Sequence, residues 1–172
     1  SRNSVRNITA HLLEKGRTLP GFMGDIGYAQ SNRERYEGFC QALMDAGKTP
    51  NPSLCLTTPL GIDSYREEID SFLSSLSRMP DAFVCASDYV ACILMQLLEK
   101  RGLRVPEDVA VSGFDNNIED LLAENLTTVQ VFNEELGSRL ALQILYRIKY
   151  PHTPHEVTYL ESKVLYRAST GD

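Results

Sequence analysis

Short polar segments follow four apolar runs of this sequence and hold the side chains best suited to bind a ligand. The segments are Gly24-Asp25, Thr57-Thr58, Ser87-Asp88 and Asp115-Asn116-Asn117. In an open parallel sheet, ligands bind beyond the carboxyl ends of the strands. Hydroxyl, amide and carboxylate groups at that edge favour a small polyhydroxylated or amide-bearing ligand. A phosphate site would need a glycine-rich loop, and the chain has neither a G-x-G-x-x-G nor a Walker pattern.

Arg35 and Asp115 are the charged candidates for contact with such a ligand. Arg35 falls in the first turns of the helix predicted after the first strand, where a guanidinium can reach over the strand ends. The alternative is a surface arginine paired with Glu34 or Glu37. Asp115 ends a predicted strand, so it is either a ligand acceptor or an aspartate that shapes a turn.

Ser87 is the third candidate, and it has a structural alternative. It stands where the fourth helix is predicted to begin, so its hydroxyl is equally suited to cap that helix. Asp88 at the next position favours the helix dipole in either case.

Catalytic and metal chemistry find little support in the side chains of this sequence. No histidine follows a strand near a serine or cysteine nucleophile, and there is no G-x-S-x-G elbow. His152 and His155 lie in a proline-rich loop, for which a solvated loop is favoured over a metal site. We therefore expect no enzyme activity, no cofactor and no metal. The cysteines match no zinc pattern and are interpreted as unpaired apolar side chains in a reducing compartment: Cys40, Cys55, Cys85 and Cys92.

The elements that must position these residues follow from the alternation of apolar patterns. Buried strands are predicted at 19–23, 54–58, 82–86 and 109–114, separated by stretches with helical apolar stripes. Strands that are apolar on both faces belong in parallel sheets covered by helices. The sequence therefore predicts an α/β fold: a doubly wound parallel sheet in three α/β/α layers.

The pattern loosens after residue 120. A short strand is predicted at 126–129, and a long helix follows with its apolar stripe over 136–148 and Asn133 as its N-cap. Short β segments are predicted at 157–160 and 164–166, and residues 170–172 are expected to fray.

Composition limits the classes of partner. The chain has 172 residues, of which 42% are apolar and 23% charged, with a net charge of −6. An acidic surface repels phosphate backbones, so this chain alone is a poor nucleic-acid binder. No run approaches the roughly 20 apolar residues of a membrane helix, and the N-terminus lacks a signal-peptide core. We expect a cytoplasmic protein with no membrane contact.

Several motifs, in order and at matching spacing, resemble the LacI/GalR family of bacterial transcription regulators. Leu103 to Asp115 reads LRVPEDVAVSGFD and resembles the family's most specific signature. Other matches are Asn32 to Phe39 (NRERYEGF), Ala86-Ser87-Asp88, Leu126 to Val129 (LTTV), Glu134 to Gly137 (EELG), and Leu160 to Ser162 with Tyr166 to Thr170. Together they span nearly the whole chain.

The resemblance implies a periplasmic-binding-protein-like lobe that binds a sugar, nucleobase or related effector against a second lobe. It implies that Arg35 and Asp115 contact the ligand, with Ser31 as a weaker candidate. Ser87 replaces the usual asparagine, Asn116 a frequent aspartate, and Val131-Phe132 a polar-proline pair, a more apolar wall that argues against a plain hexose. It further implies a homodimer that reaches operator DNA only through a headpiece absent here.

The same resemblance implies that most of the first lobe is also absent. We expect residues 1–18 to be a helix of that lobe, 19–126 the second lobe, 127–157 a crossover and first-lobe helix, and 158–172 the closing strands and tail. The apolar faces of both first-lobe helices would then lack a partner, which favours pairing with each other, self-association or mobility. Effector binding by this chain alone would be weak. The alternatives are an exported sugar-binding protein of the same architecture or, less favoured, an enzyme.

Overall fold

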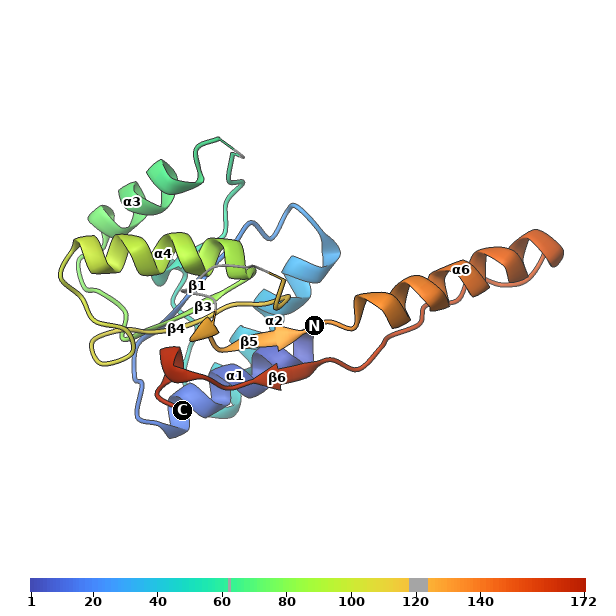
Figure 1. The fold of residues 1–172 in the computed structure, drawn as a ribbon. Helices are drawn as coiled ribbons and strands as arrows, with labels where there is room; N and C mark the ends of the chain where they lie inside the picture. The colour runs from blue at the N-terminus through green and yellow to red at the C-terminus, as the bar shows by residue number, and fades with distance from the viewer. Residues whose placement is uncertain (62, 118–123) are drawn as a thin grey trace.

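The computed structural model describes residues 1–61, 63–117 and 124–172. Helices and strands alternate through the first two thirds of the chain (Figure 1). The elements are α1 (Arg2–Glu14), β1 (Pro20–Met23), α2 (Gln30–Asp45), η1 (Pro52–Leu54), β2 (Cys55–Leu56), α3 (Tyr65–Ser75), β3 (Ala82–Cys85), α4 (Asp88–Lys100), β4 (Ala110–Ser112), β5 (Thr128–Gln130), α6 (Asn133–Lys149), β6 (Lys163–Leu165) and η2 (Ala168–Thr170).

The central sheet is parallel and has the strand order β2-β1-β3-β4. Single parallel bridges continue it toward β5, joining Ser112 to Thr127 and Asp115 to Gln130. β5 then pairs antiparallel with β6. Every residue of β1, β3 and β4 is buried, as expected for strands covered on both faces. The predicted doubly wound α/β fold is confirmed.

The two faces of the sheet carry separate apolar cores. On one face α1 and α2 pack with Phe22, Val84 and Ala110. On the other, α3 and α4 pack with Phe83, Cys85 and other strand residues. Because neighbouring residues of one strand point to opposite faces, the short strands supply both cores and produce the three layers.

The expectation that residues 1–18 form a helix of another lobe, with an unpartnered apolar face, is wrong. Val5, Ile8 and Leu12 are at most 1% exposed and belong to the core beneath α2. The two helices approach closely at Gly38, where an added Cβ would lie 2.3 Å from the carbonyl oxygen of Arg2. The apolar stripe read from the sequence is correct, but its partners are α2 and this sheet.

Unlike α1, α6 projects away from the body, and the chain that follows it runs back beside it (Figure 1). None of its residues is buried. Its large apolar side chains are about half exposed or more: Leu136, Leu140, Leu142, Ile144, Leu145, Tyr146 and Ile148. An unpartnered apolar face was predicted for this helix, and the exposure confirms it. Pairing with α1 is ruled out as its cover, because the stripe of α1 is already buried.

Three local predictions in the last third of the chain are wrong. α6 has Phe132 in its N-cap position and begins at Asn133, so Asn133 does not cap it. Residues 157–160 form no strand, and the first three of them are exposed. The chain end does not fray, because Ser169 and Thr170 are each only 2% exposed.

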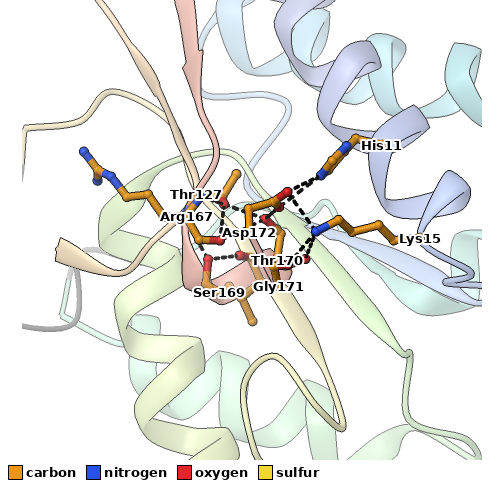
Figure 2. A network of polar contacts seen from close by, with 9 residues as sticks. His11, Lys15, Thr127, Arg167, Ser169, Thr170, Gly171 and Asp172 are labelled. Atoms are coloured by element: carbon orange, nitrogen blue, oxygen red, sulfur yellow. Dashed lines mark hydrogen bonds and ion pairs between the residues drawn. The ribbon is translucent and has the colours of Figure 1, made fainter.

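A polar network fixes the chain end against the body (Figure 2). The Ser169 hydroxyl donates to the carbonyl oxygen of Val111 in β4, at 2.6 Å. The Asp172 carboxylate accepts from Nε2 of His11 at 3.0 Å and from Nζ of Lys15 at 2.8 Å. The last residues therefore tie α1 to the edge of the sheet, and they hold β6 in place as the closing strand.

Candidate ligand-binding site

Arg35 lies over the carboxyl ends of β3 and β4, where the sequence predicted it. Its NH1 group donates to the carbonyl oxygen of Ala86 and, at 3.4 Å, to Oδ1 of Asn32. Its NH2 group donates to Oδ1 of Asp115 at 3.3 Å. The guanidinium carbon stands 3.7 Å from the centroid of the Phe114 ring, an arrangement in which a cation is attracted to the ring face. The alternative of a solvated arginine paired with Glu34 or Glu37 is wrong.

The guanidinium of Arg35 is buried but not fully bonded. The residue is 9% exposed, and its Nε has no hydrogen-bond partner among the described residues. Burial lowers its pKa, and the nearby Asp115 carboxylate opposes that shift. A buried N–H without a hydrogen-bond partner lowers the stability of the fold, so an acceptor opposite Nε would be stabilising.

Asp115 follows β4 in a backbone conformation that side chains other than glycine seldom adopt. Its φ is 107° and that of Asn116 is 50°, both in the left-handed half of the map. The N–H of Asp115 donates to the carbonyl oxygen of Val129 at 3.1 Å. Burial raises the pKa of the Asp115 carboxyl, while Arg35 acts to lower it. Strain of this kind is frequent where a side chain is held for a ligand.

Asp88 supports this loop from beneath and was not singled out for that role from the sequence. It is 2% exposed and accepts from the Thr128 hydroxyl at 2.5 Å and from backbone N–H groups that include those of Asn116 and Asn117. Burial raises its pKa against those hydrogen bonds. Gly113 makes room for it, since a Cβ there would lie 2.3 Å from Oδ1 of Asp88. An acid in the first turn of the helix that follows a strand is the only signal of this role in the sequence.

The structure shows a capping role for Ser87 and gives only the position of Ser31. Ser87 is the N-cap of α4, and its hydroxyl oxygen accepts from the N–H of Val90 at 3.3 Å. The capping alternative is therefore confirmed, and it places Ser87 next to Ala86, whose carbonyl holds Arg35. Ser31 lies in the first turn of α2, one turn before Arg35, and is half-buried. Both serines thus lie on elements that begin at the carboxyl edge of the sheet.

Two open cavities adjoin the chain that leads into α6 or returns from it. One of about 990 Å³ runs between the start of α1 and the returning chain, with Asn7, Phe132, Tyr159 and Ser162 among its lining. Another of about 420 Å³ lies between α6 and residues 153–156. The pair of Arg35 and Asp115 lines neither of them. Arg35 and Asp115 form a polar surface at the carboxyl edge of the sheet.

The fold and this edge define the class of protein, and comparison with known families agrees. The chain belongs to the periplasmic binding protein-like domain family, whose model matches residues 9–170. The resemblance to effector-binding domains of LacI/GalR regulators is confirmed by named relatives. The HTH-type transcriptional repressor PurR of Aliivibrio salmonicida is 29% identical over 163 residues, which cover 94% of this chain and 48% of that protein.

Solved structures give the same result. A protein described as a transcriptional regulator of the LacI family, from Sanguibacter keddieii, superposes with a TM-score of 0.84 at 28% identity, covering 99% of this chain and 65% of that one. A complex of the transcriptional regulator CelR with cellobiose superposes with a TM-score of 0.83 at 27% identity, covering 97% and 52%. The chain spans about half the length of the curated relatives it matches.

The relatives also bear on the competing functions. They are described as transcriptional regulators, not as exported binding proteins or enzymes, which favours the regulator over both alternatives. Within the described ranges, none of the helices is long and apolar enough to cross a membrane.

Proposed function

We propose that this chain is part of the effector-binding domain of a LacI/GalR-type transcription regulator. A small polar effector, a sugar or a nucleoside-like molecule, binds between two lobes and modulates the affinity of the parent protein for its operator. The family match, the order of the motifs and the descriptions of the relatives support this proposal.

One observation carries the ligand site within this proposal. An arginine whose side chain is 10% exposed lies 3.3 Å from a carboxylate that is 30% exposed, at the carboxyl edge of a parallel sheet. In this proposal Arg35 donates to the effector and Asp115 accepts from it, so the pair suits a neutral ligand with neighbouring donors and acceptors. Ser87 and Ser31 are secondary contacts. The Ser87 oxygen accepts from a helix N–H, which leaves its proton available to donate.

The remaining parts of the parent protein belong to the same proposal. The apolar face of α6 packs on a first lobe outside these 172 residues, which assigns the helix to that lobe, whereas Thr127, Thr128 and Val129 are buried in this body. The parent acts as a cytoplasmic homodimer, binds operator DNA through a separate headpiece, and requires neither a metal nor a cofactor. Support comes from the exposure of α6, the acidic net charge of this chain and the partial coverage of its relatives.

A thermal-shift screen of neutral sugars and nucleosides on the full-length protein tests the proposal. We expect at least one compound to raise the melting temperature, and we expect Arg35→Ala and Asp115→Ala to abolish that rise. Arg33→Ala is the matched control, because Arg33 is an exposed arginine on the same helix. A stabilising compound that is unaffected by both site variants would remove the site assignment.

A further inference from the structure

The side chain of Asn116 joins the loop that carries Asp115 to the two strands at the base of α6. Its Nδ2 group donates to Oε1 of Gln130 at 2.5 Å. Its Oδ1 accepts from NH2 of Arg167 at 3.0 Å. The Asn116 amide thus donates to Gln130 and accepts from Arg167. This fixes its orientation, because a flipped amide would place its Nδ2 donor against the donor of Arg167.

These two partners stand where the chain leaves the body and where it returns. Gln130 is the last residue of β5, three residues before α6 begins. Arg167 follows β6, the strand on which the chain comes back, and also donates to the carbonyl oxygen of Leu126 at 3.1 Å. β5 and β6 pair with each other, and α6 projects from the body beyond them (Figure 1). We call this pair of strands the stalk. Asn116 therefore binds the last residue of β5 and the second residue after β6.

The same loop carries the ligand-facing group. Asp115 and Asn116 are consecutive, and both have positive φ, so their side chains diverge from one short, strained segment. One side chain faces Arg35 and the other faces the stalk. The strain of such residues persists only where surrounding contacts hold them, and a change in the contacts of one residue shifts the backbone of the other.

We infer that Asn116 is a positioning residue that couples the Arg35–Asp115 pair to the β5–β6 stalk. This inference rests on the proposed function. It makes the loop a route by which effector contact at Asp115 changes the orientation of α6 and of the lobe that α6 joins. The inference assigns no ligand contact to Asn116.

Hydrogen exchange on the 172-residue chain tests the coupling without any ligand. Asp115→Asn removes the charge that faces Arg35, and we expect exchange in the segments 128–130 and 163–165 to change by about threefold or more. In the Asn116→Gly background, which keeps the left-handed backbone and removes the amide, the same change at Asp115 should alter exchange in the stalk much less, because only the backbone contact of Asp115 with β5 remains. Asn117→Gly is the matched control and should preserve the response, because the Asn117 side chain is exposed.

Two results would overturn the inference. One is a response of the stalk to Asp115→Asn that is equal with and without the Asn116 amide, and the other is no response in the unmodified background. Thermal unfolding of each variant verifies that the body remains folded under the exchange conditions.

A second measurement separates this inference from the proposed function. In the full-length protein, the compound with the largest thermal shift in the sugar and nucleoside panel is used as the probe. At a probe concentration that saturates each protein, the probe should lose most of its effect on operator affinity in Asn116→Gly, and saturation removes any change in its dissociation constant from the comparison. A probe effect on the operator equal to that of the unmodified protein would contradict the coupling. A probe that has no effect on the unmodified protein would instead contradict the proposed function.

Discussion

The guanidinium of Arg35 and the carboxylate of Asp115 meet at 3.3 Å although 80 positions separate them in the chain. The arginine side chain is 10% exposed and the aspartate side chain 30% exposed. The pair is thus asymmetric, because the carboxylate is more accessible to water than the guanidinium. That asymmetry predicts how each half of the pair contributes to stability.

Asp115→Asn should lower the free energy of unfolding by about 1–3 kcal/mol, because it leaves a buried guanidinium without a counter-charge. Arg35→Met should cost less, because the apolar side chain still covers Phe114 and the freed carboxylate can be hydrated. Urea unfolding measures both, with Arg33→Met as the exposed control. A larger cost for Arg35→Met than for Asp115→Asn would contradict the asymmetry.

Gly113→Ala should destabilise the body by about 2 kcal/mol or more, since its Cβ would meet Oδ1 of Asp88 at 2.3 Å and the Cα of the same residue at 3.0 Å. Gly137→Ala is the matched control. Gly137 lies within α6 with open space around it, so alanine there should raise helix content by circular dichroism. Equal unfolding midpoints for Gly113→Ala and the unmodified protein would refute the close packing at Asp88.

Asp172 gives a pH dependence of known sign. Burial opposes its ionisation, but hydrogen bonds from Lys15, His11 and Thr170 prevail and lower its pKa to about 2. A depressed pKa stabilises the fold above the ordinary aspartate value, near 4, and this stability is lost as the pH falls toward 2. A shift of one pKa unit corresponds to about 1.4 kcal/mol. After reduction for partial exposure, the Asp172 carboxylate contributes about 1–2 kcal/mol to stability at neutral pH.

Asp172→Asn should therefore lower the free energy of unfolding by that amount at pH 7, and the difference should disappear near pH 2. Urea unfolding across this range measures it. Glu99→Gln serves as the control for loss of one negative charge at an exposed position. A difference that stays constant from pH 7 to pH 2 would show that the carboxylate of Asp172 is not the group responsible.

The exposure of α6 predicts an effect on association without an effect on the body. Replacing Leu140, Ile144 and Ile148 together by glutamine should reduce self-association of the 172-residue chain in sedimentation equilibrium. The unfolding midpoint of the body should stay within the error of the measurement, because these side chains contact none of its core. A fall of several degrees would indicate that α6 packs on the body.

The layers of the fold and the pair of charged site residues were accessible from the sequence, and the reasons are physical. Apolar residues at successive positions before Gly24 and Ser87 identify strands buried on both faces, and such strands require helices on both sides. The carboxyl-edge rule then places Arg35 and Asp115 together without any knowledge of distance.

The features that could not be predicted are those that depend on which surfaces pack against each other. The stripe of Val5, Ile8 and Leu12 shows that α1 buries a face, but not that the face lies on α2, and the resemblance assigned it to another lobe. The stripe on α6 looks the same in the sequence and is exposed. Periodicity gives the face of a helix and says nothing of its partner. The support of the site by Asp88 depends likewise on contacts among three separate segments.

The central claim is that the Arg35–Asp115 pair receives a small effector, and calorimetric titration of the full-length protein tests it most directly. The compound that gives the largest thermal shift is titrated into the unmodified protein and into Asp115→Ala, with Arg33→Ala as control. We predict a dissociation constant at least about tenfold weaker for Asp115→Ala, since a hydrogen bond to a charged group contributes about 1.5–3 kcal/mol. Equal dissociation constants for Asp115→Ala and the unmodified protein would contradict the claim.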